Sequence, residues 1–419
     1  MIAVPDSFDR RLSPDAAGPI AAAFSGGGDS LMALKLTKAW ADRNGRQVIA
    51  LTVDHGLQPA SAAWTRAAGA AAERLGVEFR ALAWLGDRPR TGLAAAARAA
   101  RHALIAGAAR EAGARVVVFG HTADDVIEAA VMRGEGLRIG APREWSPSPA
   151  WPAGRGLFLL RPLLGLRRAA IRKALAAGGE RWIDDPANED PASPRARARP
   201  LAARQSDFEP ACGTESVDEA VRTLARRAAI DEAGAIRLSR PALARTPEPA
   251  ALRRVLGAAL TCAGGRPEPP RSERLEALTL RLRAGEPFAA TLAGAKLTAS
   301  DGEALIVRDA GEFRRAGLAA LDLPALGQAV WDGRFEIMAG GAPGAVRPLV
   351  GHMKALPNEQ SKALRRFAPD ARRALPRFVT PAGIATCPIL AGSPYASAKS
   401  LVTERFFSAC GVYTREPAT

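Results

Sequence analysis

Several features that define other protein classes are scarce in this 419-residue chain. Its four cysteines, at positions 212, 262, 387 and 410, stand singly and form no Cys-x-x-Cys pair. Neither a disulfide framework nor a zinc or iron–sulfur site is therefore indicated. No apolar run reaches the roughly 18 uncharged residues of a membrane-spanning helix, and residues 1–14 lack the apolar core of a secretory signal. These absences predict a cytoplasmic protein with no membrane partner.

Aromatic residues are also few, at 5% of the chain, which argues against recognition dominated by base stacking. Acidic residues are outnumbered by basic ones, 43 to 58, which gives a formal net charge of +15. A basic excess of this size indicates a polyanionic partner such as a nucleic acid, because each Lys or Arg that meets a phosphate releases a condensed counterion. Coding bias toward Ala and Arg is the alternative explanation.

No lysine follows a glycine, so the chain has no Gly-x4-Gly-Lys-Ser/Thr loop and simple γ-phosphate hydrolysis is not its default chemistry. A different glycine-rich loop, Ser25-Gly26-Gly27-Gly28-Asp29-Ser30, joins a strand predicted at 19–24 to a helix predicted at 29–43. Backbone N–H groups at such a helix start form an anion site, and Asp29 can hold Mg²⁺. A purely structural glycine turn is the bland alternative. The loop predicts an ATP-consuming enzyme that releases pyrophosphate.

Short apolar runs alternate with helical patterns over residues 18–183, which predicts an α/β fold with a doubly wound parallel sheet. Beyond residue 216 the pattern is first helical and Arg-rich, then strand-like over 287–308, and finally rich in Gly and Pro. We expect a catalytic domain at 1–205, a helical middle domain at 206–318, and a small α+β C-terminal domain at 319–419.

Polar residues follow the second and fourth predicted strands, at the sheet edge where doubly wound folds bind ligands. Asp54 ends the second strand and can accept a hydrogen bond from adenosine, although a strand-end turn explains it equally well. Asp124 and Glu128 are four residues apart, so they share one helix face with Asp125 beside them. These carboxylates suit Mg²⁺ or the amino group of a cationic substrate, and capping of the helix dipole is the alternative.

Five segments make the chain resemble the tRNA(Ile)-lysidine synthases of the PP-loop ATP pyrophosphatase superfamily. In family order they are SGGGDS (25–30), DHGL (54–57), GHTADDVIE (120–128), RPLL (161–164) and DPANED (185–190). Three arginines at 195, 197 and 199 resemble the end of the family's catalytic domain, and residues 287–308 resemble its middle domain.

The resemblance implies two chemical steps on the wobble cytidine of tRNA(Ile) with a CAU anticodon. ATP adenylates the cytosine O2 and releases pyrophosphate, and the ε-amine of L-lysine then displaces AMP at C2. The implied catalytic residues are Asp29, Asp124, Asp125 and Glu128, with Mg²⁺ on Asp29 and Asp124. The implied ATP-binding residues are Ser25, Gly26, Gly27, Gly28, Asp29, Ser30, Asp54, His55, Gly120 and His121. The implied lysine- or tRNA-binding residues are Asp125, Glu128, Arg161, Asn188, Arg195, Arg197 and Arg199.

Three alternatives stay open: a related tRNA thiolase, a small-molecule amidating ligase, and an inactive RNA-binding protein with the same fold. The oligomeric state also stays open, a homodimer among the options. Because the three arginines at 195–199 alternate, an extended segment is expected to project them to one side. Clusters such as Arg365-Arg366 and Arg372-Arg373 are expected to hold the body of the tRNA.

Overall fold

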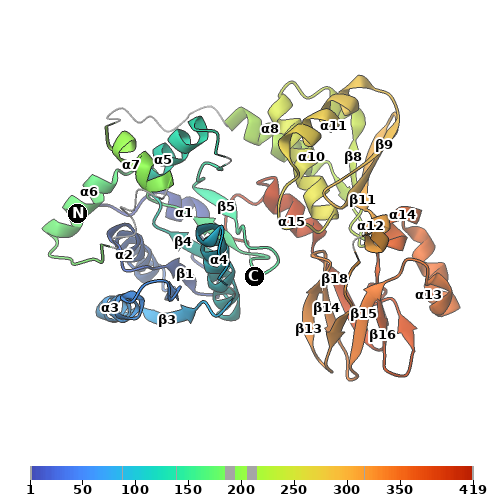
Figure 1. The fold of residues 1–419 in the computed structure, drawn as a ribbon, viewed down its shortest axis with the longest axis horizontal. Coiled ribbons are helices and arrows are strands. Elements are labelled where there is room, and N and C mark those ends of the chain that lie inside the picture. Colours follow the sequence, from blue (N-terminus) through green and yellow to red (C-terminus); the bar gives the residue numbers. More distant parts are fainter. Residues whose placement is uncertain are drawn as a thin grey trace. The chain divides into compact units, whose positions relative to one another are not determined.

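A computed structural model describes residues 2–86, 88–137, 139–184, 194–204, 215–315 and 317–417. These fall into two compact units (Figure 1). The first comprises Met1–Cys212 and Tyr413–Thr419, and the second comprises Gly213–Val412. The predicted site residue Asn188 and the segment 185–190 lie outside the described residues. Within the described ranges, no helix combines the length and apolar character needed to cross a membrane.

A six-stranded sheet in the order β3-β2-β1-β4-β6-β5 forms the centre of the first unit. Neighbouring strands are parallel except at the β5 edge, which confirms the predicted doubly wound parallel sheet. The strands are β1 (Ile20–Ala23), β2 (Val48–Asp54), β3 (Glu78–Ala83), β4 (Val116–Phe119), β5 (Trp145–Pro147) and β6 (Phe158–Leu160).

Helices cover both faces of this sheet, and the alternation of side chains along each strand decides which helices they meet (Figure 1). Val116 and Val118 pack in the core with α2, α3 and α6, whereas Val117 and Phe119 pack on the other face with α4. Because both faces are buried, the central strands read as unbroken apolar runs. The helices are α1 (Ser7–Arg11), α2 (Gly28–Arg43), α3 (Ser61–Arg74), α4 (Leu93–Glu111), α5 (Ala123–Gly134), α6 (Arg168–Ala177) and α7 (Pro194–Arg204).

The second unit holds two apolar cores. The first lies between helices and a sheet in the order β7-β8-β11-β10-β9, and its last three strands occupy the region where strand-like runs were expected. Its elements are α8 (Glu215–Arg226), β7 (Ala229–Ile230), β8 (Ile236–Ser239), α9 (Arg240–Ala244), α10 (Pro249–Ala263), α11 (Ser272–Ala284), β9 (Phe288–Leu292), β10 (Ala295–Ala299), β11 (Glu303–Arg308) and α15 (Val402–Ala409).

The second core of this unit involves two small sheets, β12-β15-β16-β17 and β13-β14-β18, and short helices, in keeping with the α+β prediction. The strands are β12 (Leu321–Leu323), β13 (Gln328–Trp331), β14 (Phe335–Ala339), β15 (Gly344–Pro348), β16 (Pro376–Val379), β17 (Ala385–Thr386) and β18 (Ala396–Ser400). The helices are α12 (Ala310–Arg315), η2 (Met353–Ala355), α13 (Asn358–Ala363), η3 (Leu364–Arg366) and α14 (Pro369–Arg373).

The last residues of the chain pack into the first unit. Glu416 forms a two-pronged ion pair with Arg46, with nitrogen–oxygen distances of 2.6 and 3.0 Å, and both side chains are almost fully buried. Trp145 Nε1 donates a hydrogen bond of 2.9 Å to the carbonyl oxygen of Tyr413. The first unit is therefore completed by a segment that lies some 370 positions from Arg46 in sequence.

We expect Glu416→Gln to destabilise the first unit by about 3–5 kcal/mol, because removing one partner leaves a buried guanidinium without its counter-charge. Urea unfolding of the full chain followed by tryptophan fluorescence measures this loss. Glu73→Gln on α3, an exposed position, is the matched control and should leave the transition in place. Equal midpoints for wild type and Glu416→Gln would show that the buried pair contributes nothing.

Candidate active site

The glycine-rich loop lies between β1 and α2, as predicted, and its geometry is fixed by its own side chains. Ser30 Oγ donates a hydrogen bond of 2.8 Å to the Gly27 carbonyl and accepts one of 3.3 Å from the Ser25 N–H. Gly26 has a φ of +81°, and a Cβ there would lie 2.5 Å from Ile183. The positive φ favours glycine at position 26, and any side chain there would also require the Ile183 side chain to shift. The loop is preformed, with the start of α2 beside it.

A second glycine brings the β4 end against this loop. A Cβ on Gly120 would lie 2.6 Å from the backbone oxygen of Asp29. The close approach places the start of α5 next to the start of α2. It explains how residues predicted from two separate motifs come to one place.

A cavity of about 520 Å³ opens at this edge of the sheet, a size within the usual range for ligand pockets. Most predicted residues line it: Ser25, Gly27, Gly28, Asp29, Ser30, Asp54, His55, Gly120, His121, Asp125, Arg195 and Arg199. The other predicted residues that the structure describes do not line it: Gly26, Asp124, Glu128, Arg161 and Arg197. Residues that the sequence did not indicate also line it: Leu57, Trp64, Arg101, Arg168 and Arg172.

Asp54 and His55 form a turn at the end of β2, one of the two roles that the sequence analysis considered for Asp54. Asp54 Oδ1 accepts a hydrogen bond of 2.8 Å from the Gly56 N–H. The His55 ring packs edge-on against Trp84 with 5.9 Å between ring centroids, and burial lowers the pKa of His55. Both residues also line the cavity.

Three carboxylates at the start of α5 have different neighbours. Asp124 accepts a 2.7 Å hydrogen bond from the Arg168 backbone N–H, at the start of α6, and pairs with Arg167 at 3.2 Å. Asp125 accepts from the Thr122 backbone N–H at 2.7 Å, so it caps its own helix, and pairs with Arg195 at 3.0 Å. Asp124 and Asp125 thus each accept a backbone hydrogen bond at the start of a helix, as the helix-capping explanation predicted. Of the two, Asp125 also lines the cavity.

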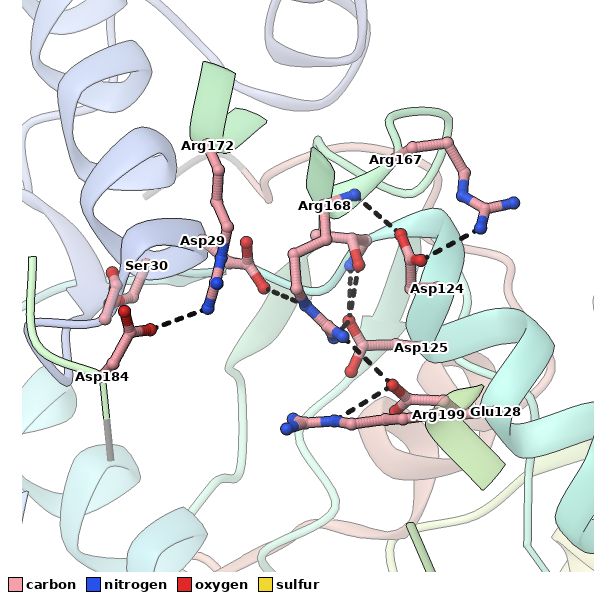
Figure 2. A network of polar contacts seen from close by, with 12 residues as sticks. Asp29, Ser30, Asp124, Asp125, Glu128, Arg167, Arg168, Arg172, Asp184 and Arg199 are labelled. Carbon is pink, nitrogen blue, oxygen red and sulfur yellow. Dashed lines mark hydrogen bonds and ion pairs between the residues drawn. The ribbon is translucent and has the colours of Figure 1, made fainter. Parts of the chain in front are cut away.

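Glu128 is the centre of the ion pairs (Figure 2). Its side chain has no exposed surface, and it pairs with Arg195 at 2.9 Å, Arg168 at 3.2 Å and Arg199 at 3.4 Å. Arg168 extends from α6 and also pairs with Asp29 of the glycine-rich loop at 2.9 Å. The guanidinium of Arg168 therefore joins the glycine-rich loop to the acidic start of α5.

The predicted extended segment at 195–199 is wrong, because these residues lie in the helix α7. Pro194 opens this helix, a position that proline favours, and Ala and Arg are good helix formers. Residues four apart share a helix face, so Arg195 and Arg199 both reach Glu128. Arg197 falls on another face.

Positive charge gathers on another part of the cavity wall. Burial lowers the pKa of Arg101 to about 10, with Arg98 nearby adding to the effect. Among the described residues, Arg101 Nε has no hydrogen-bond partner. Arg161 Nε donates a 3.2 Å hydrogen bond to His121 Nδ1, and burial lowers the pKa of His121 to about 3, so this imidazole is neutral. Arginines remain charged at neutral pH, and this wall suits an anion.

Mg²⁺ was expected on Asp29 and Asp124. In the described part of the chain, no three His, Cys, Asp or Glu side chains are arranged to hold a metal by themselves. Mg²⁺ usually takes one or two carboxylates and completes its shell with substrate phosphates and water. Asp29 fits that requirement, because it lines the cavity beside the Ser25 and Ser30 hydroxyls. Burial raises the pKa of Asp29, and Arg168 opposes that rise.

The chain is similar to several known proteins. A family model described as a PP-loop domain matches residues 4–204. A tRNA(Ile)-lysidine synthase from Caulobacter vibrioides is 49% identical over 99% of this chain and 98% of its own length. One from Hyphomonas neptunium is 38% identical over 67% of this chain and 79% of its own. A U34-tRNA thiolase structure from Methanococcus maripaludis is 19% identical, with a TM-score of 0.40 over 47% of this chain and 69% of that one. On its full-length similarity to the first of these, this chain belongs to the tRNA(Ile)-lysidine synthase family.

Proposed function

We propose that this chain uses ATP to join L-lysine to C2 of the wobble cytidine of tRNA(Ile) with a CAU anticodon. The cytosine O2 attacks the α-phosphorus of ATP, and pyrophosphate leaves. The lysine ε-amine then adds to C2, the C2–O2 bond breaks, AMP leaves with that oxygen, and the amine gives up a proton. The observation that carries the proposal is the 49% identity to a tRNA(Ile)-lysidine synthase over nearly the whole of both chains.

The two differently charged walls of the cavity support this assignment. ATP would place its phosphates on the glycine-rich loop, with the Arg101 side of the cavity supplying positive charge. Mg²⁺ would be held by Asp29 and would neutralise charge on the departing pyrophosphate. The placement of Asp124 against the start of α6 favours an anchoring role for it over the expected metal role. Catalysis would consist mainly of positioning and electrostatic stabilisation.

Lysine would bring its positive amino groups to Asp125 and Glu128. The pKa of Asp125 is below its ordinary value, because burial would raise it but the surrounding positive charge and the Thr122 N–H more than offset that effect. Asp125 is therefore ionised at neutral pH and lines the cavity. An ionised carboxylate beside the phosphate loop suits a cationic amine that must attack an activated base.

The thiolase alternative is disfavoured by the cysteines. Of the four cysteines, Cys212 lies outside the described residues, and Cys262, Cys387 and Cys410 are buried. Burial raises the pKa of each of these three thiols, to about 11 for Cys262 and about 12 for Cys387. A sulfur carrier needs an accessible thiolate. A small-molecule amidating ligase has less use for a net charge of +15. The division into domains at 1–205, 206–318 and 319–419, the cytoplasmic location and a homodimer remain parts of the proposal.

The direct test is transfer of radiolabelled lysine to tRNA(Ile) transcripts by the full chain with ATP. We expect label on the transcript with a CAU anticodon and none on a transcript whose wobble base is uridine. ATP-dependent incorporation of sulfur into the tRNA, with no incorporation of lysine, would show that the chain is a thiolase. Pyrophosphate release with a small acid and ammonia, without tRNA, would make it an amidating ligase.

Asp29→Ala should lower turnover about a hundredfold or more, because losing a charge at a transition-state metal costs several kcal/mol. Asp42→Ala, an exposed position at the other end of α2, is the matched control and should retain activity. Circular dichroism checks that both variants fold. An Asp29→Ala enzyme with more than about a tenth of wild-type turnover would remove Asp29 from the chemistry.

Glu128→Gln and Asp125→Asn should each raise the lysine KM by about ten- to a hundredfold, which corresponds to one charge-assisted hydrogen bond. The ATP KM should change much less. Steady-state kinetics with each substrate varied separately gives both values. Equal increases in the two KM values would instead assign these carboxylates to the nucleotide and its metal.

Arginines of η3 and α14 are proposed to grip the tRNA body. Arg365 and Arg373 are exposed, and replacing both by Gln should weaken binding of all tRNAs alike, because interactions with phosphates carry no sequence information. The slope of log K against log salt should fall by about one for each phosphate that the variant no longer neutralises. Filter binding across a salt series measures both effects, and Arg43→Gln at an exposed position of α2 is the control. An unchanged slope would show that these arginines only face solvent.

A further inference from the structure

The carboxylates proposed to receive lysine are already neutralised by the protein's own arginines. Asp125 and Glu128, together with the neighbouring Asp29, contact Arg168, Arg195 and Arg199, so three negative charges face three positive ones. Adding the ammonium group of lysine to this cluster would leave a surplus positive charge at a largely buried place. Such a surplus is costly where the effective dielectric constant is low. One guanidinium must therefore move away before lysine binds well.

Of these three arginines, Arg168 is the one that pairs with Asp29 of the glycine-rich loop. Its Nε lies 2.9 Å from Asp29 Oδ2, its Nη1 3.2 Å from Glu128 Oε1, and its Nη2 3.7 Å from Asp125 Oδ2. Figure 2 shows the side chain reaching from α6 between Asp29 on one side and the acids of α5 on the other. Arg195 and Arg199 come from α7 and contact the acids of α5.

The backbone of Arg168 is fixed while its side chain has alternative partners. Asp124 accepts the Arg168 backbone N–H at 2.7 Å, and Arg167 holds Asp124 from the other side at 3.2 Å. The Arg168 side chain lines the cavity and retains 20% of its exposure. A triphosphate on the loop would bring several negative charges next to Asp29, which the planar guanidinium matches with two parallel hydrogen bonds.

We propose that Arg168 is a positioning residue that couples the two substrate sites. Without nucleotide, Arg168 neutralises the acids of α5 and keeps lysine affinity low. When ATP occupies the loop, Arg168 turns to the phosphates, and Asp125 and Glu128 become available to the lysine ammonium group. Lysine thus binds well only beside a loaded nucleotide. The inference rests on the proposed assignment of lysine to these two carboxylates.

The coupling is measured by lysine binding to the full-length protein with and without adenosine 5′-(α,β-methylene)triphosphate, an analogue that cannot lose pyrophosphate. Titration calorimetry should show wild type binding lysine about tenfold more tightly with the analogue, a typical coupling strength. Because coupling between two sites is reciprocal, lysine should increase the affinity for the analogue by the same factor. Arg168→Gln should bind lysine with one affinity, whether or not the analogue is present.

Lys173→Gln is the matched control, since it removes one exposed positive charge from the same helix and should keep the wild-type coupling. Arg168→Lys keeps the positive charge but loses the planar guanidinium, so we expect reduced but measurable coupling in this variant. If Arg168→Gln does not fold, Arg168→Lys takes its place in the test. Equal lysine affinity with and without the analogue in wild type, or full coupling in Arg168→Gln, would overturn the proposal. Failure of the proposed function is distinct, because wild type would then transfer no lysine to tRNA(Ile) at all.

Discussion

The arrangement of the site depends on compensating a carboxylate that has no exposed surface. Leaving an ionised Glu128 unpaired in such a place would cost far more free energy than a protein of ordinary stability can lose. Arg168 and Arg195 meet it from α6 and α7, two elements that do not belong to the sheet. The requirement to pair one charge thus draws α5, α6 and α7 together on one side of the cavity. Because Arg168 pairs with both Glu128 and Asp29, it also joins the glycine-rich loop to the start of α5.

On the opposite wall of the cavity, the positive charge of Arg101 has no counter-charge among the described residues. The two walls therefore differ in charge. Arg101 is half-buried, and its buried Nε has no hydrogen-bond partner in the part of the chain that the structure describes. Folding alone would favour a partner there. Perturbed and unpaired ionisable groups concentrate at functional sites because a ligand completes them. An anionic nucleotide on that wall would supply the charge that the protein lacks there, whereas the acids on the opposite wall already have arginine partners.

The sequence predicted the features that are local and missed those that depend on distant contacts. Loop, strand and helix at 20–43 follow from neighbouring residues, and the parallel sheet follows from repeated apolar runs, so both were predicted correctly. Arg168 was missed because its partner Asp29 is 139 positions away and nothing in the local pattern distinguishes it from Arg167. The alternation at 195–199 was misinterpreted because a period of two in charged residues is also compatible with a helix when the residues between them are alanines. Side-chain pairing across elements is a property of the fold, and no single segment encodes it.

The order of the chain imposes a further constraint on the site. Residues 4–204 match the PP-loop domain, yet the buried Arg46 takes its carboxylate from Glu416, at the far end of the sequence. Ser13 and Gly18 supply only carbonyl oxygens to that guanidinium, which are hydrogen-bond acceptors without a full negative charge. The buried Arg46 therefore gains its counter-charge only after Glu416, which follows the second unit in the chain, has been synthesised. Because Glu416 also accepts the Ser13 N–H at 3.0 Å, it fixes the segment between α1 and β1, the strand that leads into the phosphate loop. The last residues of the chain thus support the strand on which the nucleotide site is built.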